Sequence, residues 1–155
     1  MSLTTETAID YTINLGDGRP VVHCHGHASS RLEIQLYSAA ALRQGVRLIC
    51  MDRPGIGRSD PRPDASILTW PSDVAEAASL IGLDRFAVQG MSGGGIYALA
   101  CAYGIPDRLT ACGLISTLAT NDQIKAAGPF WMRRIWWIGE HLPWLFWPHL
   151  RFKSW

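Results

Sequence analysis

The chain has 155 residues, of which 48% are hydrophobic and 17% are charged. A chain of this length is long enough for one domain with a substantial core and too short for a barrel of eight βα units. The hydrophobic content excludes a disordered chain, and the net charge of +1 excludes the broad basic surface with which many proteins bind nucleic acid.

The first part of the chain alternates between short β-branched runs and helical patterns, as a parallel α/β sheet requires. Ser30 and Glu33 have the spacing of a capping box, which predicts a helix that continues to about Arg43. Pro71 opens the next helix, and Gly82 ends it. In chain order, the expected strands are 8–15, 21–25, 46–51, 86–89 and 109–116, and the expected helices are 30–43, 71–81 and 93–103.

The C-terminal part differs from the rest in composition. Residues 131–155 hold six of the seven tryptophans and carry a local charge of +3. We predict two parts, an α/β core at 1–120 and the start of a helical, Trp-rich cap at 121–155; a helix on a membrane surface is the alternative for the tail. One apolar helix face is expected from residues that repeat at helical spacing, namely Trp131, Ile135, Ile138 and Leu142.

The spacing of the cysteines argues against a zinc ribbon, and that of the glycines argues against a nucleotide cofactor. The glycines match neither a P-loop nor the dinucleotide-binding pattern, so no cofactor is expected. The sequence contains no apolar run of about 18 residues, so no membrane-spanning helix is predicted. The N-terminal residues show no signal peptide. The four cysteines form no CxxC pair and are expected to be buried free thiols in a reducing cytoplasm; they are Cys24, Cys50, Cys101 and Cys112.

The strongest chemical signal is the G-x-S-x-G pattern between a predicted strand and a predicted helix. A serine on such a sharp turn takes a strained backbone conformation and projects its hydroxyl above the edge of the sheet, so Ser92 is the candidate nucleophile. Gly90 and Gly94 stand where strand and helix approach too closely for a side chain. The N–H of Gly93 would donate to a developing oxyanion.

This pattern resembles the nucleophile elbow of the α/β-hydrolase superfamily, and two further segments extend the resemblance. The segment from His25 to His27 is similar to the family's oxyanion loop, and residues 52–60, DRPGIGRSD, are similar to the loop after its next strand. The resemblance implies a partial α/β-hydrolase fold, with a mostly parallel sheet and flanking helices. It also implies a serine-dependent hydrolase of an ester or related acyl bond in a small molecule, with the N–H of His27 as the second oxyanion donor.

A serine nucleophile needs a general base, normally a histidine that a carboxylate holds in place. Only His141 and His149 follow Ser92, both within the Trp-rich tail, and Asp122 is the candidate acid. We therefore expect the chain to correspond to the N-terminal half of a hydrolase and to be inactive by itself. We also expect it to self-associate through the unpaired edge of its sheet.

Two other interpretations stay open. A relative that keeps the fold but lacks the base would be a non-catalytic binding module. His23, His25 and His27 have the every-second-residue spacing of a strand, and imidazoles on one face could bind a metal ion, as in a metal-dependent hydrolase. By contrast, Asp52 and Asp60 are expected to fix their loop through bonds to main-chain N–H groups.

Overall fold

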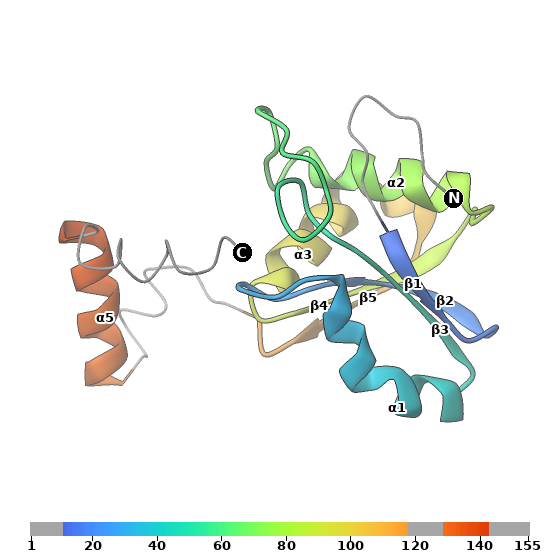
Figure 1. Ribbon diagram of the computed structural model, residues 1–155, viewed down its shortest axis with the longest axis horizontal. Coiled ribbons are helices and arrows are strands. Elements are labelled where there is room, and N and C mark those ends of the chain that lie inside the picture. The colour runs from blue at the N-terminus through green and yellow to red at the C-terminus, as the bar shows by residue number, and fades with distance from the viewer. Residues whose placement is uncertain (1–10, 118–128, 143–155) are drawn as a thin grey trace. The chain divides into compact units, whose positions relative to one another are not determined.

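The computed structural model describes residues 11–117 and 129–142 (Figure 1). The chain divides into two compact units, Met1–Leu118 and Ala119–Trp155. Within residues 11–117, the first unit is built on one sheet of five strands: β1 (Tyr11–Leu15), β2 (Arg19–Cys24), β3 (Val46–Met51), β4 (Phe86–Met91) and β5 (Leu109–Ile115).

The sheet has the strand order β1-β3-β2-β4-β5. Strand β1 is antiparallel to β3, and all other neighbours are parallel. Because β3 and β4 flank β2 on opposite sides, the direction of winding reverses at β2. His23 of β2 is in register with Gln89 of β4, and Cys24 with Gly90. The carboxyl ends of β2 and β4 therefore lie side by side at the switch point, where open α/β sheets bind their ligands.

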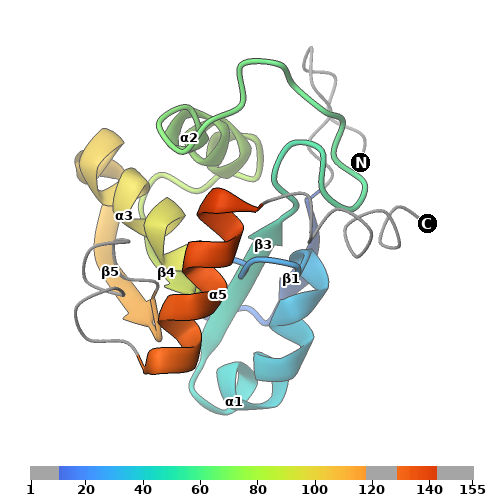
Figure 2. The same ribbon diagram turned by 90° about the vertical axis from the view of Figure 1, so that its left-hand side faces the viewer.

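Helices cover both faces of the sheet, as Figures 1 and 2 show. One face carries η1 (Arg31–Tyr37) and α1 (Ser38–Arg43), and the other carries α2 (Trp70–Leu80) and α3 (Gly94–Gly104), which is followed by the short η2 (Pro106–Arg108). Successive side chains of β3 pack alternately on the two faces of the sheet. Ile49 and Met51 join the core with α2 and α3, whereas Leu48 and Cys50 pack with Ile34 of η1. This period of two is what a strand buried on both sides requires.

The predicted helix at 30–43 forms in two pieces, and its predicted capping box is incomplete. The Ser30 hydroxyl accepts a hydrogen bond from the N–H of Leu32 at 3.4 Å, as a cap should. The Glu33 carboxylate, however, bonds to the N–H of Gly26 and to His23. The cysteine expectation also needs one correction, because Cys112 on β5 is exposed while the other three are buried.

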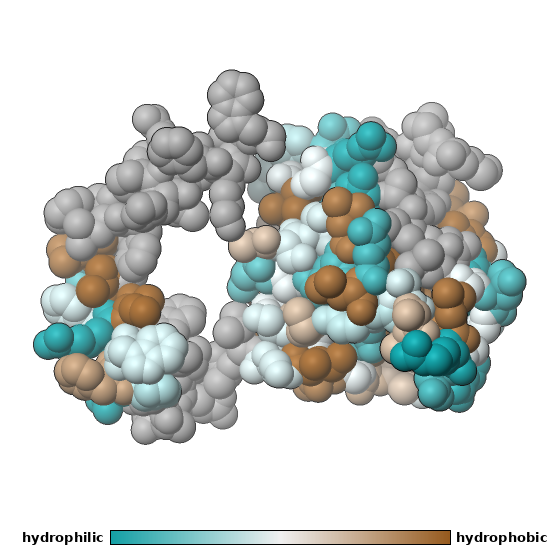
Figure 3. Space-filling view, turned by 60° about the horizontal axis from the view of Figure 1, so that its bottom comes forward, coloured by the Kyte–Doolittle hydropathy of each residue, from teal (hydrophilic) through white to brown (hydrophobic). Residues whose placement is uncertain are grey.

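Apolar side chains remain exposed outside the core. Leu36 of η1 and Leu42 of α1 are 79% and 58% exposed, and Figure 3, which looks toward the α1 side, shows apolar spots separated by polar residues. Among the described residues, β5 pairs with β4 alone, and its residues Leu114 and Ile115 are exposed. No helix in the described ranges is both long enough and apolar enough to cross a membrane.

In the second unit, the described residues form α5 (Phe130–His141). The helix predicted from the spacing of the tail is therefore present. The Arg134 guanidinium lies 4.8 Å from the centre of the Phe130 ring, and Trp137 stacks on His141 at 4.6 Å. The cap role of the tail stays a prediction, and its apolar segment at 144–148 lies outside the described residues.

Replacing Gly82 with alanine tests the end of α2. Gly82 has a φ of +73°, and a methyl group at this position would meet nothing within 4 Å. The cost of Gly82→Ala is therefore conformational, and we expect the free energy of unfolding to fall by about 1 kcal/mol. Urea unfolding measures it, with Gly82→Asn as the control, since asparagine tolerates this conformation better. Equal unfolding free energies of wild type and Gly82→Ala would contradict the positive φ of Gly82.

Candidate active site

Ser92 lies on the turn between β4 and α3, where the sequence pattern predicts it. Its φ of +51° falls in the left-handed region that non-glycine residues rarely adopt. The Ser92 N–H donates to the carbonyl oxygen of Ile115 at 2.9 Å, and its own carbonyl oxygen accepts from Gly95 at 3.2 Å. Hydrogen bonds on both sides thus hold Ser92 in a strained conformation, as is common at functional turns.

The glycines of the pattern are required by close packing. A methyl group at Gly94 would overlap the carbonyl oxygen of Cys24 and would lie 2.6 Å from that of His25. A methyl group at Gly90 would overlap the Gly94 carbonyl and would lie 2.7 Å from the Cα of Gly95. Helix α3 therefore reaches the ends of β4 and β2 only because these positions carry no side chain.

The structure brings the loop after β2 against this turn. A methyl group added to Gly26 would lie 3.7 Å from the Cβ of Ser92, and one added to Gly93 would lie 2.7 Å from the Cγ of His27. The His27 ring thus sits against the residue that follows Ser92. Gly93 and His27, the two predicted oxyanion donors, are neighbours in space although they are far apart in the sequence.

Arg53 and His25 hold this loop from the side of β3. The Arg53 guanidinium donates to the carbonyl oxygens of His25 and Gly26 at 2.5 and 3.0 Å. It also lies 4.5 Å from the centre of the Tyr97 ring. The fully buried His25 ring uses both nitrogens, since Nδ1 bonds to the Gly26 oxygen at 3.0 Å and Nε2 accepts from the Arg53 N–H at 3.5 Å.

Burial, assisted by the charge of Arg53, lowers the pKa of His25 to about 4. The imidazole is therefore neutral in the folded protein, whereas an unfolded histidine has a pKa of about 6.5. Between these values only the unfolded chain binds the proton, so we expect stability to be lost as the pH falls from about 6.5 toward about 4. The loss is on the order of 3 kcal/mol.

Urea unfolding at a series of pH values measures this effect against the variant His25→Gln. The variant cannot take up a proton at position 25, so its unfolding free energy should fall less steeply over the same pH range. Parallel pH profiles for wild type and His25→Gln would show that the buried His25 is not responsible for the loss.

The loop at 52–60 is fixed by the buried carboxylate of Asp52. This carboxylate accepts bonds from the N–H of Arg31 at 2.7 Å and of Arg58 at 3.1 Å, and it forms an ion pair with the Arg31 side chain. Asp52 therefore has the structural role expected of it. For Asp60, the described contact is through the main chain, since its carbonyl oxygen accepts from the N–H of Gly55 at 3.1 Å.

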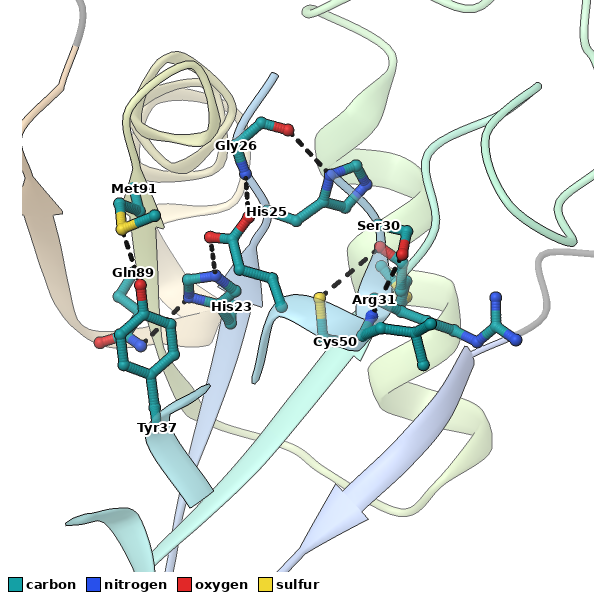
Figure 4. Close-up of polar contacts among 12 residues, drawn as sticks. His23, His25, Gly26, Ser30, Arg31, Tyr37, Cys50, Gln89 and Met91 are labelled. Carbon is teal, nitrogen blue, oxygen red and sulfur yellow. Dashed lines mark hydrogen bonds and ion pairs between the residues drawn. The ribbon is translucent and has the colours of Figure 1, made fainter. Parts of the chain in front are cut away.

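A second buried network lies between β2, β4 and η1 (Figure 4). One oxygen of the Glu33 carboxylate accepts from the Gly26 N–H at 2.9 Å, and the other is 3.0 Å from Nε2 of His23. Nδ1 of His23 is 3.2 Å from the Gln89 amide nitrogen. A neutral His23 satisfies this arrangement, with Nε2–H as donor and Nδ1 as acceptor, and burial accordingly lowers its pKa.

These contacts contradict the hypothesis of a metal site at His23, His25 and His27. A metal ligand needs a free ring lone pair, but His23 and His25 each use both ring nitrogens in hydrogen bonds to different partners. His27 lies against Gly93 instead. The three side chains therefore do not converge, and no group of three metal-ligating side chains occurs within 11–117 or 129–142.

A cavity of about 250 Å³ opens beside His27. Its walls include the Trp70 and Tyr97 rings, which meet edge to face at 5.9 Å, and the side chains of Arg53 and Asp73. The Asp73 carboxylate is already paired with Arg62 through two bonds of 2.5 and 3.1 Å. The cavity is thus small, its wall is mixed in polarity, and its charged groups Arg53 and Asp73 are already engaged.

The described residues supply no histidine bonded to the Ser92 hydroxyl. His141 on α5 contacts the Trp137 carbonyl oxygen at 2.9 Å. The candidates Asp122 and His149 lie outside the described residues. The roles of Glu33, Gln89 and Arg53 are not predictable from the sequence, because their long side chains give no local signal for them.

A mostly parallel sheet with a sharp turn between strand and helix at its carboxyl edge is typical of the α/β hydrolases. The model of the family described as "alpha/beta hydrolase fold" matches residues 19–143. The chain therefore belongs to the alpha/beta hydrolase fold family, as the resemblance implies.

Individual relatives agree with this assignment. The chain is 31% identical over 97 residues to the protein named "Putative carbamate hydrolase RutD" of Enterobacter cloacae, a match that covers 61% of this chain and 36% of that protein. An esterase from Thermogutta terrifontis is similar in structure, with 24% identity, a TM-score of 0.66 and coverage of 84% and 54%. A hydrolase from Pseudomonas aeruginosa gives 21% identity, a TM-score of 0.69 and coverage of 81% and 50%.

The two structural matches establish the fold alone. The chain spans between about a third and about a half of the length of these relatives.

Proposed function

We propose that the protein is a serine-dependent hydrolase of an ester or a related acyl bond in a small molecule. Ser92 is the nucleophile, and the N–H groups of Gly93 and His27 are the oxyanion donors. The single observation that carries the proposal is the strained Ser92, with a φ of +51°, on the turn that packs against the loop of Gly26 and His27. In this proposal the Ser92 hydroxyl acts beside two main-chain segments whose N–H groups can donate to an oxyanion.

The chemistry follows from these parts. The Ser92 hydroxyl attacks the acyl carbon, its proton passes to a base, and the negative charge that develops on the acyl oxygen is stabilised by the two N–H donors. The N-terminus of α3 adds its partial positive charge at the same place. A carbamate is one acyl bond of this class, and the name of the similar RutD protein supports its inclusion among the substrates.

The cavity beside His27 is the proposed binding site for one end of the substrate. The Trp70 and Tyr97 rings favour an apolar group of modest size in about 250 Å³. The buried free thiols of the core agree with a cytoplasmic location, where thiols stay reduced.

A non-catalytic binding module is the second candidate. One observation favours it, namely that no histidine within the described residues bonds to the Ser92 hydroxyl. A covalent trap distinguishes the two. In the longest natural form of the protein that contains these residues, a fluorophosphonate should add once to Ser92, with a mass increase that Ser92→Ala abolishes. Wild-type protein that stays unlabelled would favour the binding module.

A further inference from the structure

We propose that Glu33 and Arg53 are positioning residues that hold Gly26 from its two sides and thereby set the direction of the His27 N–H. The inference rests on the proposed function, because it treats this N–H as an oxyanion donor. Neither residue needs to touch the substrate for this role. Each acts through the main chain of the loop that follows β2.

The carbonyl oxygen of Gly26 is the first of two main-chain groups that side chains hold. Two donors hold it, Nδ1–H of His25 and an Nη2–H of Arg53, each at 3.0 Å. This carbonyl belongs to the same peptide group as the N–H of His27. The described residues contain no cis peptide bond, and in a planar trans peptide the C=O and the N–H point in opposite directions. Donors that fix the Gly26 oxygen therefore also fix the His27 N–H.

The N–H of Gly26 is the second main-chain group that a side chain holds. It donates to Oε2 of Glu33 at 2.9 Å, so the preceding peptide group is fixed as well. Glycine has more rotational freedom than any other residue, and Gly26 would otherwise let the loop turn about its φ and ψ angles. With both of its peptide groups held, that freedom is lost before any substrate binds, as electrostatic preorganisation requires.

Glu33 is itself held in place from the opposite side. Its side chain is 4% exposed, and its second oxygen bonds to His23. His23 in turn bonds to Gln89 (Figure 4). Burial by itself raises the pKa of Glu33, but hydrogen bonds from Ser29, the Gly26 N–H and His23 bring it below its ordinary value. The carboxylate is therefore ionised, and a charged acceptor makes the bond to the Gly26 N–H stronger than a neutral one would.

The first test needs no catalysis and uses nuclear magnetic resonance on the 155-residue chain. A hydrogen bond to a carboxylate moves an amide proton downfield, so Glu33→Gln should move the Gly26 amide proton upfield. The matched control Glu76→Gln changes an exposed glutamate of α2 and should leave this signal in place. If Glu33→Gln does not fold, the wild-type chain provides the test. A scalar coupling between the Gly26 nitrogen and the Glu33 carboxyl carbon would then demonstrate the hydrogen bond.

The second test is kinetic and uses the longest natural form of the protein. A catalytic group displaced by about 1 Å can cost about 100-fold in rate. We therefore expect Glu33→Gln to lower kcat for p-nitrophenyl acetate by about 10-fold to 100-fold with KM within about twofold. Glu76→Gln should leave both constants unchanged. A general loss of structure would instead change KM as well as kcat, and would shift signals throughout the nuclear magnetic resonance spectrum.

The outcomes separate this inference from the proposed function. An unmoved Gly26 amide in Glu33→Gln, or no coupling in the wild type, overturns the contact and the inference with it. A moved amide with an unchanged kcat overturns the positioning role alone. If Ser92→Ala keeps full activity, the proposed function fails. The oxyanion role inferred for the contact between Glu33 and Gly26 is then overturned as well, even where Glu33→Gln moves the Gly26 amide signal.

Discussion

Replacing Gly94 with alanine is expected to lower the free energy of unfolding by about 3 kcal/mol, the upper end of the usual range for an overpacked site. The added methyl group would overlap the carbonyl oxygen of Cys24 and lie 2.6 Å from that of His25. Both atoms belong to the main chain at the end of β2, so neither can rotate away as a side chain would. Relief requires α3 to move off the sheet, which would open the core around Ala98 and Cys101.

Gly113→Ala is the matched control for this prediction. A methyl group on Gly113, in β5, would lie 3.5 Å from the Cβ of Gln89, which is an ordinary contact. We expect its unfolding free energy to stay within about 0.5 kcal/mol of wild type. Urea unfolding of the two variants measures the difference. Equal stability of Gly94→Ala and Gly113→Ala would mean that α3 and β2 are not as close as the structure has them.

The elbow could be predicted from the sequence because its requirements are local. A strand, a sharp turn and a helix within a few residues leave glycine as the residue that fits at Gly90 and Gly94, and the residues between them fix Ser92 on the turn. The expected strand at 46–51 also forms over its full length, as β3. Strands buried on both faces leave a nearly continuous apolar run, which Arg47 alone interrupts here and which one sequence suffices to reveal.

The role of Glu33 could not be predicted in the same way. Its spacing from Ser30 satisfies a local capping rule, and the Ser30 half of that rule is obeyed. The carboxylate has a second set of partners, Gly26 and His23, which exists only once β2 lies beside η1. The hydrogen-bond partners of a long side chain are brought within reach only by the tertiary fold, so local sequence spacing does not determine them. The same holds for Arg53, which lies far in sequence from the carbonyl oxygens it binds.

The metal hypothesis failed for a related reason. Alternation in a strand places His23 and His25 on one face only while the strand continues, and β2 ends at Cys24. His25 lies beyond this end, where it bonds to Gly26 and Arg53. Alternation therefore holds within β2 but cannot be extended into the loop.

The largest kinetic effect is expected from Ser92→Ala in the longest natural form of the protein. Loss of the nucleophile costs up to about 10⁶-fold in well-studied serine hydrolases, because the base and the oxyanion donors then have no hydroxyl to assist. We expect hydrolysis of p-nitrophenyl acetate to fall by at least about 10³-fold. The Ser92→Thr variant is a useful companion, since it keeps a hydroxyl but adds a methyl group on a residue with positive φ.

The same substitution should have no effect on the 155-residue chain. No histidine within the described residues bonds to the Ser92 hydroxyl, and without a base this hydroxyl stays a neutral, weakly nucleophilic alcohol. We expect the wild-type chain to hydrolyse p-nitrophenyl acetate no faster than Ser92→Ala does. A rate that depends on Ser92 in this chain would instead require a nearby base. His27 is then the group to test by His27→Ala, because its ring already lies against Gly93, the residue after Ser92.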